Sequence, residues 1–541
     1  MQNTFYGKLF ASRSVLCFTV IIMLMLSCVL RVAVIATGNY SSIQAEQASY
    51  RITVSNTRGT VYDCNMVPLT NTSSKTVAAV VPTPKSITAL KNCVSGELPE
   101  SVIDALENKK PVVCTVERKI DSEGIAFAEV YEHTPEYLSA CHLIGYTDTS
   151  GHGVSGLEQA YDDVLYSDST VSAVFSMDGK GGVLNGIEPY FENDLSAVSS
   201  GVVTTLDINI QNITENAILK MNSGCAVVAE VPSGKIRAMA SAPLFDVNNL
   251  TDSLTAENSP LLNRALSAYS VGSVFKPCVA ASAIKCGLGS LTFECTGSLE
   301  IADRVFRCHN LSGHGNMNLC SALAQSCNCF FYNCAINLGG EPIFKTASAL
   351  NFGSRIKIAD NLYTAQGSIP KLETLNNDGA LVNLSIGQGE LLLSPVNMLT
   401  LYLSIAGDGS YYLPSVVEKT LKDGVETLYD KGKPTRVMSR ETAEILRQYL
   451  STVITEGTGA EAMPQNCTAA GKTATAQTGR YYNNGEEITN SWFCGFFPAD
   501  EPRYVAVVMS DSKLNVSTAS VFAKIADDIT LLYDKNIQNS N

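Results

Sequence analysis

Ser270-Val271-Gly272-Ser273-Val274-Phe275-Lys276-Pro277, near the middle of the 541-residue chain, is the stretch on which both fold and chemistry depend. A serine is a poor nucleophile at neutral pH and needs a base within hydrogen-bonding reach. Residues three apart on a helix face the same way, so we expect Ser273 and Lys276 to lie side by side. Gly272 permits a tight turn, and Pro277 suits an early helical position. This predicts Ser273 at the positive, N-terminal end of a helix, which favours an oxyanion.

The Ser-x-x-Lys pattern alone is weak evidence, because the chain contains other copies that most simply form solvated polar pairs. These copies are Ser282/Lys285, Ser354/Lys357, Ser368/Lys371 and Ser510/Lys513. Ser282 lies nine residues after Ser273, so on one continuous helix it would point to the opposite side. Only further motifs can distinguish Ser273 from these copies.

The composition describes an ordinary globular protein with ample core, since 45% of residues are hydrophobic and 17% are charged. The length predicts about three or four domain-sized units, or one large domain with a smaller companion. The net charge of −14 argues against a nucleic-acid partner, because no basic stripe is available to neutralise phosphates. Five histidines without a His-Glu-x-x-His motif argue against a catalytic zinc.

Residues 14–36 form the one stretch of membrane length, since twenty-odd helical residues span a bilayer core of about 30 Å. Lys8 and Arg13 precede the stretch and no acidic residue does, so we expect residues 1–13 to stay in the cytoplasm. An uncleaved signal-anchor is favoured. A cleaved signal peptide is the alternative, although its best cleavage site matches poorly.

Seventeen cysteines are many for an exported protein. Cys17 and Cys28 lie in the membrane stretch, which leaves an odd number outside that cannot all pair internally. We therefore expect mostly free thiols, although Cys295 and Cys308 could form a local disulfide. A zinc site made of these two cysteines with His309 and His314 is a weaker alternative, because the spacing fits no standard ligand set. We expect no metal and no cofactor.

The region between the anchor and residue 200 mixes short strands with one helix, after a polar stalk over residues 38–47. The segments expected are strands over 77–81, 112–116 and 125–131 and a helix over 101–107. Glycine-rich turns around Glu158 indicate architecture rather than chemistry.

A second unit is expected to begin near residue 200. Residues 202–206 predict a strand, Asp207 a helix cap, residues 208–221 a helix, and residues 225–240 a hairpin around Pro232-Ser233-Gly234. With a mostly helical middle and late strands, this order indicates an α+β domain.

Two further motifs follow Ser273 along the chain. Ser326-Cys327-Asn328 lies 53 residues later, and its hydroxyl and carboxamide could relay a proton and bind a substrate amide. Lys472-Thr473-Ala474 lies 146 residues further on, in a run of small residues that suits a strand approached closely by a ligand. Its ammonium and hydroxyl would bind a carboxylate. A second copy, Lys345-Thr346-Ala347, lies in a helix-like run, and we expect no role for it in the site.

In order and spacing these motifs resemble the signature of penicillin-recognising serine acyltransferases. Longer stretches are similar to class B penicillin-binding proteins, a resemblance that runs from about residue 50 to 530. These stretches are VGSVFKP (271–277), AQSCNCFF (324–331), IGQG (386–389) with Ser394-Pro395, GKTATAQ (471–477), SWFCGFFP (491–498), RGTVYD (58–63) and GVSGLE (153–158).

The resemblance implies an α+β penicillin-binding transpeptidase/β-lactamase-like domain, in which an antiparallel sheet has helices on both sides and an all-helical part beside it. An N-terminal transmembrane helix and an elongated β-rich pedestal would precede it. The limits expected are a cytoplasmic tail (1–13), a signal-anchor (14–36), a pedestal or dimerisation-like domain with linker (37–199), a transpeptidase domain (200–535) and a frayed tail (536–541).

The resemblance also implies a monofunctional D,D-transpeptidase that cross-links peptidoglycan. Ser273 would attack the D-Ala-D-Ala carbonyl while neutral Lys276 takes its proton. Ser326 would help to relay the proton, and Asn328 would hold the amide of the donor peptide. After D-alanine leaves, an amine of a neighbouring stem peptide would attack the acyl-enzyme. β-Lactams would acylate Ser273 and stay there as covalent inhibitors.

The third motif would hold the substrate. By the family pattern, Lys472 and Thr473 bind the terminal carboxylate, and the backbone N–H groups of Ser273 and Thr475 form the oxyanion hole. Ala474 departs from the pattern, because the family usually has glycine there; Val271 replaces a frequent proline. The methyl group of Ala474 would point into a crowded strand–helix contact, where it could narrow the site or lower β-lactam reactivity.

Two other functional classes stay open. A D,D-carboxypeptidase or β-lactamase-like hydrolase would differ only in whether water reaches the acyl-enzyme. A scaffold of a cell-wall synthesis complex would need no chemistry, and the intact catalytic set weighs against it. The expected partners are stem peptides on lipid-linked or nascent glycan, and a membrane-embedded glycan polymerase or divisome or elongasome proteins bound by the pedestal. The expected location is the cytoplasmic membrane, single-pass, with the catalytic domain on the outer face.

Overall fold

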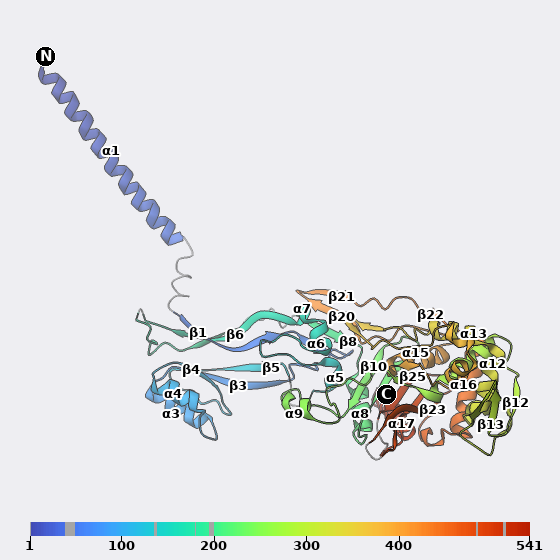
Figure 1. Cartoon of the computed structure of the whole chain (residues 1–541). Helices are drawn as coiled ribbons and strands as arrows, with labels where there is room; N and C mark the ends of the chain where they lie inside the picture. Colours follow the sequence, from blue (N-terminus) through green and yellow to red (C-terminus); the bar gives the residue numbers. More distant parts are fainter. Residues whose placement is uncertain are drawn as a thin grey trace. The chain divides into compact units, whose positions relative to one another are not determined.

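The computed structural model describes residues 2–37, 49–134, 138–178, 180–193, 200–482, 485–511 and 515–540 (Figure 1). The expected polar stalk, residues 38–47, lies outside these described residues. The chain forms two compact units that interleave along the sequence. The N-terminal unit comprises Met1–Asn56, Ser74–Val130 and Thr170–Asp194, and the C-terminal unit comprises Thr57–Ser73, Tyr131–Ser169 and Leu195–Asn541. The domain limits drawn from the sequence stay a prediction, and the compact units differ from them by placing two early segments in the C-terminal unit.

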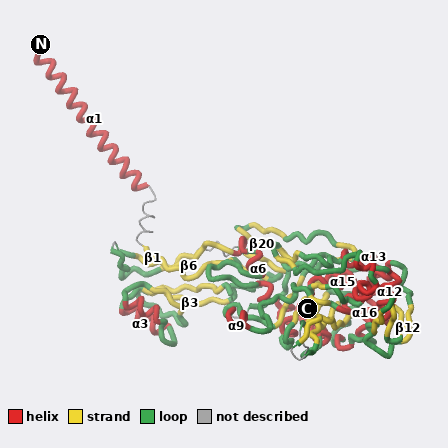
Figure 2. The backbone as a smooth tube through the Cα atoms, viewed as in Figure 1, coloured by secondary structure: helices red, strands yellow, loops and turns green. Residues whose placement is uncertain are grey.

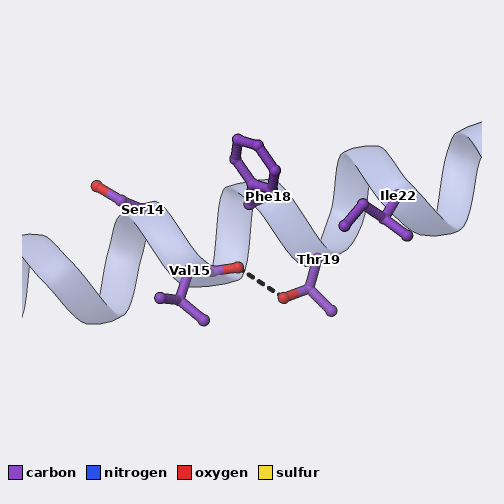
Figure 3. Close-up of a pocket in the computed structure, with 5 residues that line it drawn as sticks. All are labelled: Ser14, Val15, Phe18, Thr19 and Ile22. Carbon is purple, nitrogen blue, oxygen red and sulfur yellow. Dashed lines mark hydrogen bonds between the residues drawn. The ribbon is translucent and has the colours of Figure 1, made fainter.

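Helix α1 (Gln2–Thr37) contains the expected membrane span. Its segment Arg13–Ala36 has a mean hydropathy of 2.6, and none of its apolar window is buried by protein. The hydroxyl of Thr19 donates a hydrogen bond to the Val15 carbonyl at 2.6 Å, which satisfies this polar group inside the helix, as a lipid environment requires (Figure 3). The shallow depression drawn there lies between neighbouring side chains of this one helix, Ser14, Val15, Phe18, Thr19 and Ile22. By length and composition, α1 can cross a membrane and fits a single-pass anchor.

The N-terminal unit is rich in strands, as expected. One sheet has the order β4-β3-β5, and another has the order β1-β6-β7. Helices α3 and α4 pack their apolar faces on the first sheet around Leu90 and Leu106. The strands are β1 (Ser49–Arg58), β3 (Ser73–Val80), β4 (Val112–Thr115), β5 (Ile125–Glu132), β6 (Tyr166–Ser176) and β7 (Tyr190–Asn193), and the helices are α3 (Pro84–Cys93) and α4 (Glu100–Glu107). The three strands and the helix predicted for this unit are confirmed to within a few residues at their ends.

The C-terminal unit is built on a five-stranded antiparallel sheet of order β10-β9-β25-β24-β23. Its strands are β9 (Gly224–Glu230), β10 (Ile236–Ala242), β23 (Ala470–Tyr481), β24 (Glu487–Phe497) and β25 (Tyr504–Ser510). The predicted hairpin is confirmed as β9 and β10. The late strands return to pair with it, since β25 lies beside β9 with Val507 opposite Val227. The third motif therefore lies on β23, at one edge of the sheet.

Both faces of this sheet are covered by helices. Successive residues of a strand point to opposite sides of the sheet, so neighbouring residues join two different buried clusters. Val227 and Cys494 join one buried cluster, with residues of α10 (Lys276–Lys285) and α15 (Pro395–Ala406). Val228 and Phe493 join the other cluster, with residues of α8 (Ile208–Ile218) and α17 (Thr518–Ser540). The predicted cap is confirmed, since the Asp207 carboxylate accepts from the N–H of Asn209 at 2.9 Å. The residues predicted as a tail after 535 continue α17 to Ser540.

Helices gather beside the sheet and form the expected all-helical part (Figure 2). They are α11 (Leu319–Ala324), α12 (Asn328–Leu338), α13 (Gly340–Ala349), α14 (Asp378–Ser385) and α16 (Arg440–Thr455). The second Lys-Thr-Ala copy lies on α13, where exposed Lys345 pairs with Glu341 at 2.7 Å. That copy therefore lies on a helix, as predicted, with Lys345 exposed and Thr346 and Ala347 buried.

Short elements complete the C-terminal unit. A four-stranded sheet has the order β2-β8-β20-β21, and the other short strands pair in twos. The strands are β2 (Thr60–Tyr62), β8 (Gly201–Thr204), β11 (Tyr269–Ser270), β12 (Thr292–Cys295), β13 (Ser298–Ile301), β14 (Arg304–Arg307), β15 (Gly315–Asn318), β16 (Lys357–Ala359), β17 (Leu362–Tyr363), β18 (Leu392–Leu393), β19 (Ser410–Tyr411), β20 (Val417–Lys422), β21 (Val425–Leu428) and β22 (Thr435–Arg436). The helices are α5 (Cys141–Ile144), α6 (Gly156–Ala160), α7 (Asp162–Leu165), α9 (Leu250–Thr255) and the 3₁₀ turns η2 (Gly272–Phe275), η3 (Thr374–Asn376) and η4 (Ala460–Ala462).

A buried ion pair joins the RGTVYD and GVSGLE stretches inside the C-terminal unit. The Arg58 guanidinium donates to the Glu158 carboxylate at 2.6 Å and to the Glu158 carbonyl at 3.0 Å. The same guanidinium reaches Asp162 at 2.8 Å, and His133 contacts Glu158 at 2.8 Å. Burial alone would raise the pKa of Glu158, but His133 and Arg58 lower it overall. Glu158 thus has the architectural role expected from its glycine-rich surroundings.

We predict that Glu158→Gln lowers the free energy of unfolding by about 3 kcal/mol, because buried Arg58 would lose its buried carboxylate partner and keep only the partly exposed Asp162. Thermal unfolding of the full chain in detergent measures this change. The control is Glu426→Gln, which removes an exposed partner of Lys419 and should cost at most about 1 kcal/mol. Equal melting temperatures for the two variants would contradict the prediction.

Candidate active site

Ser273 lies on the 3₁₀ turn η2, one turn before α10 begins at Lys276. Gly272 has a φ of 63°, the left-handed conformation that glycine adopts freely, and its N–H donates to the Gly387 carbonyl at 2.9 Å. Val274 and Phe275 are fully buried, which anchors the turn, while Ser273 is partly exposed. The expected tight turn into a helix is confirmed, with a 3₁₀ turn added between the glycine and the helix.

The amine of Lys276 brings the first and second motifs together. This fully buried amine donates to the Ser326 carbonyl at 2.7 Å, to Asn328 Oδ1 at 2.7 Å and to Ser326 Oγ at 3.3 Å. The Phe331 ring lies 5.3 Å from it. Burial lowers the pKa of Lys276 to about 7, because a low-dielectric environment disfavours the ammonium form. Lys276 can therefore serve as a base near neutral pH.

The second motif has an unusual backbone at its first residue. Ser326 has a φ of 54°, in the left-handed region that a residue with a side chain rarely adopts. Such conformations persist where the surrounding structure imposes them, and they gather at functional sites. Cys327 then caps α12, and its sulfur accepts from the Phe330 N–H at 3.4 Å. This bend places both Ser326 and Asn328 on Lys276.

The third motif runs past the Ser273 turn on β23. Lys472 is fully buried, and burial and the neighbouring Lys276 both lower its pKa well below the usual range. Its amine donates to the Thr473 carbonyl at 3.1 Å, and the Thr473 hydroxyl lies 3.1 Å from that of Thr458. Thr473 is partly exposed and Thr475 is exposed, as expected of residues that meet a ligand.

The methyl group of Ala474 points toward the Ser273 turn. A Cβ placed on Gly272 would lie 3.4 Å from that of Ala474 and 3.2 Å from that of Ala476. The crowded contact expected at position 474 is therefore present, and together with the left-handed φ of Gly272 it favours glycine at position 272. The effect of Ala474 on β-lactam reactivity stays a prediction.

Several supporting residues were not singled out from the sequence. The Trp492 indole and the Asn490 amide both donate to the Ser270 carbonyl, at 2.9 and 3.3 Å. The Tyr402 hydroxyl donates to the Val274 carbonyl at 3.1 Å. These bonds hold both ends of the Ser273 turn. The only sequence signal for them was the occurrence of the chain's single tryptophan within a family-like stretch.

The arrangement supplies the parts of acyl-transfer chemistry. A partly exposed serine, a buried amine, a hydroxyl with a carboxamide, and a strand carrying a lysine and two threonines come together, as the three motifs predicted. Side chains with metal-ligand chemistry lie beside the second motif: Cys295, Cys308, His314 and Cys327. The structure pairs none of the chain's seventeen cysteines, all of them described, in a disulfide.

Comparison with known proteins agrees with this geometry. The family model described as penicillin binding protein transpeptidase domain matches residues 224–531. Stage V sporulation protein D of Bacillus subtilis is 28% identical over 495 residues, which is 84% of this chain and 74% of that protein. The peptidoglycan D,D-transpeptidase MrdA of Acinetobacter baumannii is 26% identical over 427 residues, 72% of this chain and 62% of that protein.

A solved structure shares the fold. The crystal structure of penicillin binding protein 3 from Mycobacterium tuberculosis, complexed with aztreonam, superposes with a TM-score of 0.64 at 23% identity. The match covers 90% of this chain and 98% of that one. Together with the family model, which spans more than half of the chain, these similarities assign the family. The chain belongs to the penicillin-binding protein transpeptidase family, as a class B penicillin-binding protein.

Proposed function

We propose that this protein is a serine D,D-transpeptidase that cross-links peptidoglycan stem peptides through an acyl-enzyme on Ser273. The observation that carries the proposal is the buried amine of Lys276, which has a pKa of about 7 and is held by Ser326 and Asn328. An amine that is neutral near pH 7 can accept the proton of a serine hydroxyl. The relative from A. baumannii is named for this reaction.

In the first half-reaction, Ser273 Oγ forms a bond to the carbonyl carbon of the penultimate D-alanine, and Lys276 takes its proton. The N–H groups of Ser273 and Thr475 stabilise the negative oxygen of the tetrahedral intermediate. The C–N bond to the terminal D-alanine then breaks. The proton passes from Lys276 through the Ser326 hydroxyl, 3.3 Å away, to the leaving amine.

The strand β23 supplies the binding surface for the donor peptide. It ends the order of the five-stranded sheet, so one edge is free of strand pairing among the described residues. An extended peptide can add to such an edge through main-chain hydrogen bonds. Lys472 and Thr473 bind the terminal carboxylate, and the arriving negative charge restores the ammonium form of Lys472. Lys276 donates to the oxygen of the Asn328 carboxamide, and the remaining NH₂ group of Asn328 holds the amide of the donor peptide.

In the second half-reaction, the amine of a neighbouring stem peptide attacks the acyl-enzyme and releases Ser273. A β-lactam acylates the same serine and stays bound. Helix α1 anchors the chain in the cytoplasmic membrane, and the basic residues before the span, Lys8 and Arg13, place the N-terminus in the cytoplasm and the catalytic unit outside. The β-rich N-terminal unit binds a membrane-embedded glycan polymerase or other proteins of the division or elongation machinery, as its resemblance to a pedestal implies.

The proposal predicts that the full chain in detergent, given a donor peptide ending in D-Ala-D-Ala and an amine acceptor, releases D-alanine and forms the cross-linked product. Mass spectrometry of the peptides measures both products. Ser273→Ala should abolish both, whereas Ser282→Ala, which alters the Ser-x-x-Lys copy on α10, should keep them. Release of D-alanine with only the hydrolysed donor would assign the protein to the carboxypeptidases instead.

A second prediction concerns pH. Because burial lowers the pKa of Lys276 to about 7, the neutral base should be scarce below that pH and predominant above it. The rate of acylation by a fluorescent penicillin should therefore rise about tenfold per pH unit below pH 7 and level off above it.

Lys276→Arg should slow acylation by about 10²–10⁴-fold at every pH, because a guanidinium stays protonated. The matched control is Lys345→Arg, in the exposed copy on α13, which should leave the profile unchanged. A profile with no inflection near pH 7 would contradict the assignment of Lys276 as the base.

A further inference from the structure

Four side chains with metal-ligand chemistry converge behind the second motif. The sulfurs of Cys295, Cys308 and Cys327 and a ring nitrogen of His314 all lie within 4.8 Å of one another. His314 Nδ1 is 3.6 Å from the sulfur of Cys295 and 3.6 Å from that of Cys308. The three cysteines are at most 3% exposed. The weaker zinc alternative considered from the sequence named His309, and the structure brings Cys327 in its place.

We propose that Cys295, Cys308, His314 and Cys327 bind one zinc ion. In a tetrahedral site with Zn–S bonds of about 2.3 Å and Zn–N bonds of about 2.05 Å, sulfur and nitrogen ligands lie about 3.6 Å apart. Both sulfur–nitrogen distances found here have this value. Three thiolates and one imidazole favour zinc over magnesium or calcium. Four protein ligands leave no open position, so the ion is structural rather than catalytic.

The local fold explains how these residues meet. Cys295 ends β12 and pairs with Gly315 at the start of β15, so the residue before Gly315, His314, lies beside it. The backbone reinforces this, since the His314 N–H donates to the Cys295 carbonyl at 2.9 Å. Cys308 directly follows β14, and its N–H donates to the Gly297 carbonyl at 2.9 Å. Cys327 comes from the next helix along the chain, where it is the N-cap of α12.

The segment between β12 and β15 has a reason to need a metal. It consists of two short strand pairs and their loops, and it exposes large apolar side chains, with Val305 61% and Leu311 69% exposed. A structural zinc contributes folding free energy directly where a small segment cannot bury enough apolar surface. The ion would tie this segment to α12.

A zinc ion bound by Cys327 would also fix the position of the second motif, because Cys327 is the middle residue of Ser326-Cys327-Asn328. Fixing its sulfur holds the left-handed backbone at Ser326 and the start of α12, and through them both acceptors of Lys276. The zinc would thus act as a positioning element for the base. This consequence rests on the proposed roles of Ser326, Asn328 and Lys276, whereas the metal site itself does not.

Three nearby groups are outside the proposed ligand set, and two of them, His309 and Cys334, serve as controls. His309 Nδ1 lies 3.9 Å from the Cys308 sulfur, and Cys329 is a buried thiol next to Cys308. Cys334 is a further buried thiol on α12, outside the cluster. Substituting His309 or Cys334 changes a similar group in a similar environment without removing a proposed ligand.

The first test is the metal content of the full chain, purified in detergent after growth with zinc, by inductively coupled plasma mass spectrometry. We expect one zinc per chain in the unaltered protein, in His309→Gln and in Cys334→Ser. We expect loss of zinc in Cys308→Ser and in His314→Gln. Zinc retained in both ligand variants, or absent from the unaltered protein, would overturn the proposal. So would a disulfide between two of the three cysteines, found by peptide mass analysis without reduction.

Because a ligand variant can fail to fold, a second test uses the unaltered protein. Zinc is removed with a chelator and replaced by cobalt(II), which should give tetrahedral absorption with thiolate charge-transfer bands. Removal should slow acylation by a fluorescent penicillin at least tenfold, and zinc should restore it. Octahedral cobalt without thiolate bands would refute the site. Unchanged acylation on removal would refute the positioning role, and absence of acylation from the zinc-loaded protein would count against the proposed catalytic function alone.

Discussion

The burial of one amine, that of Lys276, is the constraint on which the site depends. Removing an ammonium from water costs several kcal/mol, and the folded protein meets this cost by lowering the pKa of the amine to about 7. The neutral amine still needs acceptors, and Ser326 and Asn328 supply them at 2.7 Å. The left-handed backbone at Ser326 follows from this need, because it turns both residues toward the same nitrogen.

The surrounding fold brings segments that are far apart in the sequence close to the amine of Lys276. The antiparallel sheet places β23 against the Ser273 turn, so that a Cβ at position 272 would lie 3.2 Å from that of Ala476 and 3.4 Å from that of Ala474. Helices on both faces bury the sheet, and Trp492 and Tyr402 fix the ends of the turn by hydrogen bonds to its carbonyl groups. The fold thus holds Ser273, Lys276 and the strand that carries Lys472 and Thr473 in place.

The sequence predicted the parts that local chemistry determines. The hairpin β9–β10 and the cap at Asp207 depend on nearby residues and are confirmed. The three motifs were recognised from family-like stretches, and their residues lie near one another, whereas their catalytic roles stay a prediction. Contacts across long sequence distances were missed, because no local pattern encodes them. Examples are the pairing of Arg58 with Glu158, 100 residues apart, and the meeting of Cys327 with Cys295. The interleaving of the two compact units was missed for the same reason. It arises because segments before residue 200 pack with strands after residue 200 inside the C-terminal unit.

Acylation of Ser273 is the step on which the proposed chemistry depends most. The most direct test incubates the full chain in detergent with a penicillin and locates the adduct by intact-mass analysis and peptide mapping. We expect one stable adduct per chain on the peptide that contains Ser273, and none in Ser273→Ala. An adduct on another serine, or a folded protein that forms no adduct at high penicillin concentration, would contradict it.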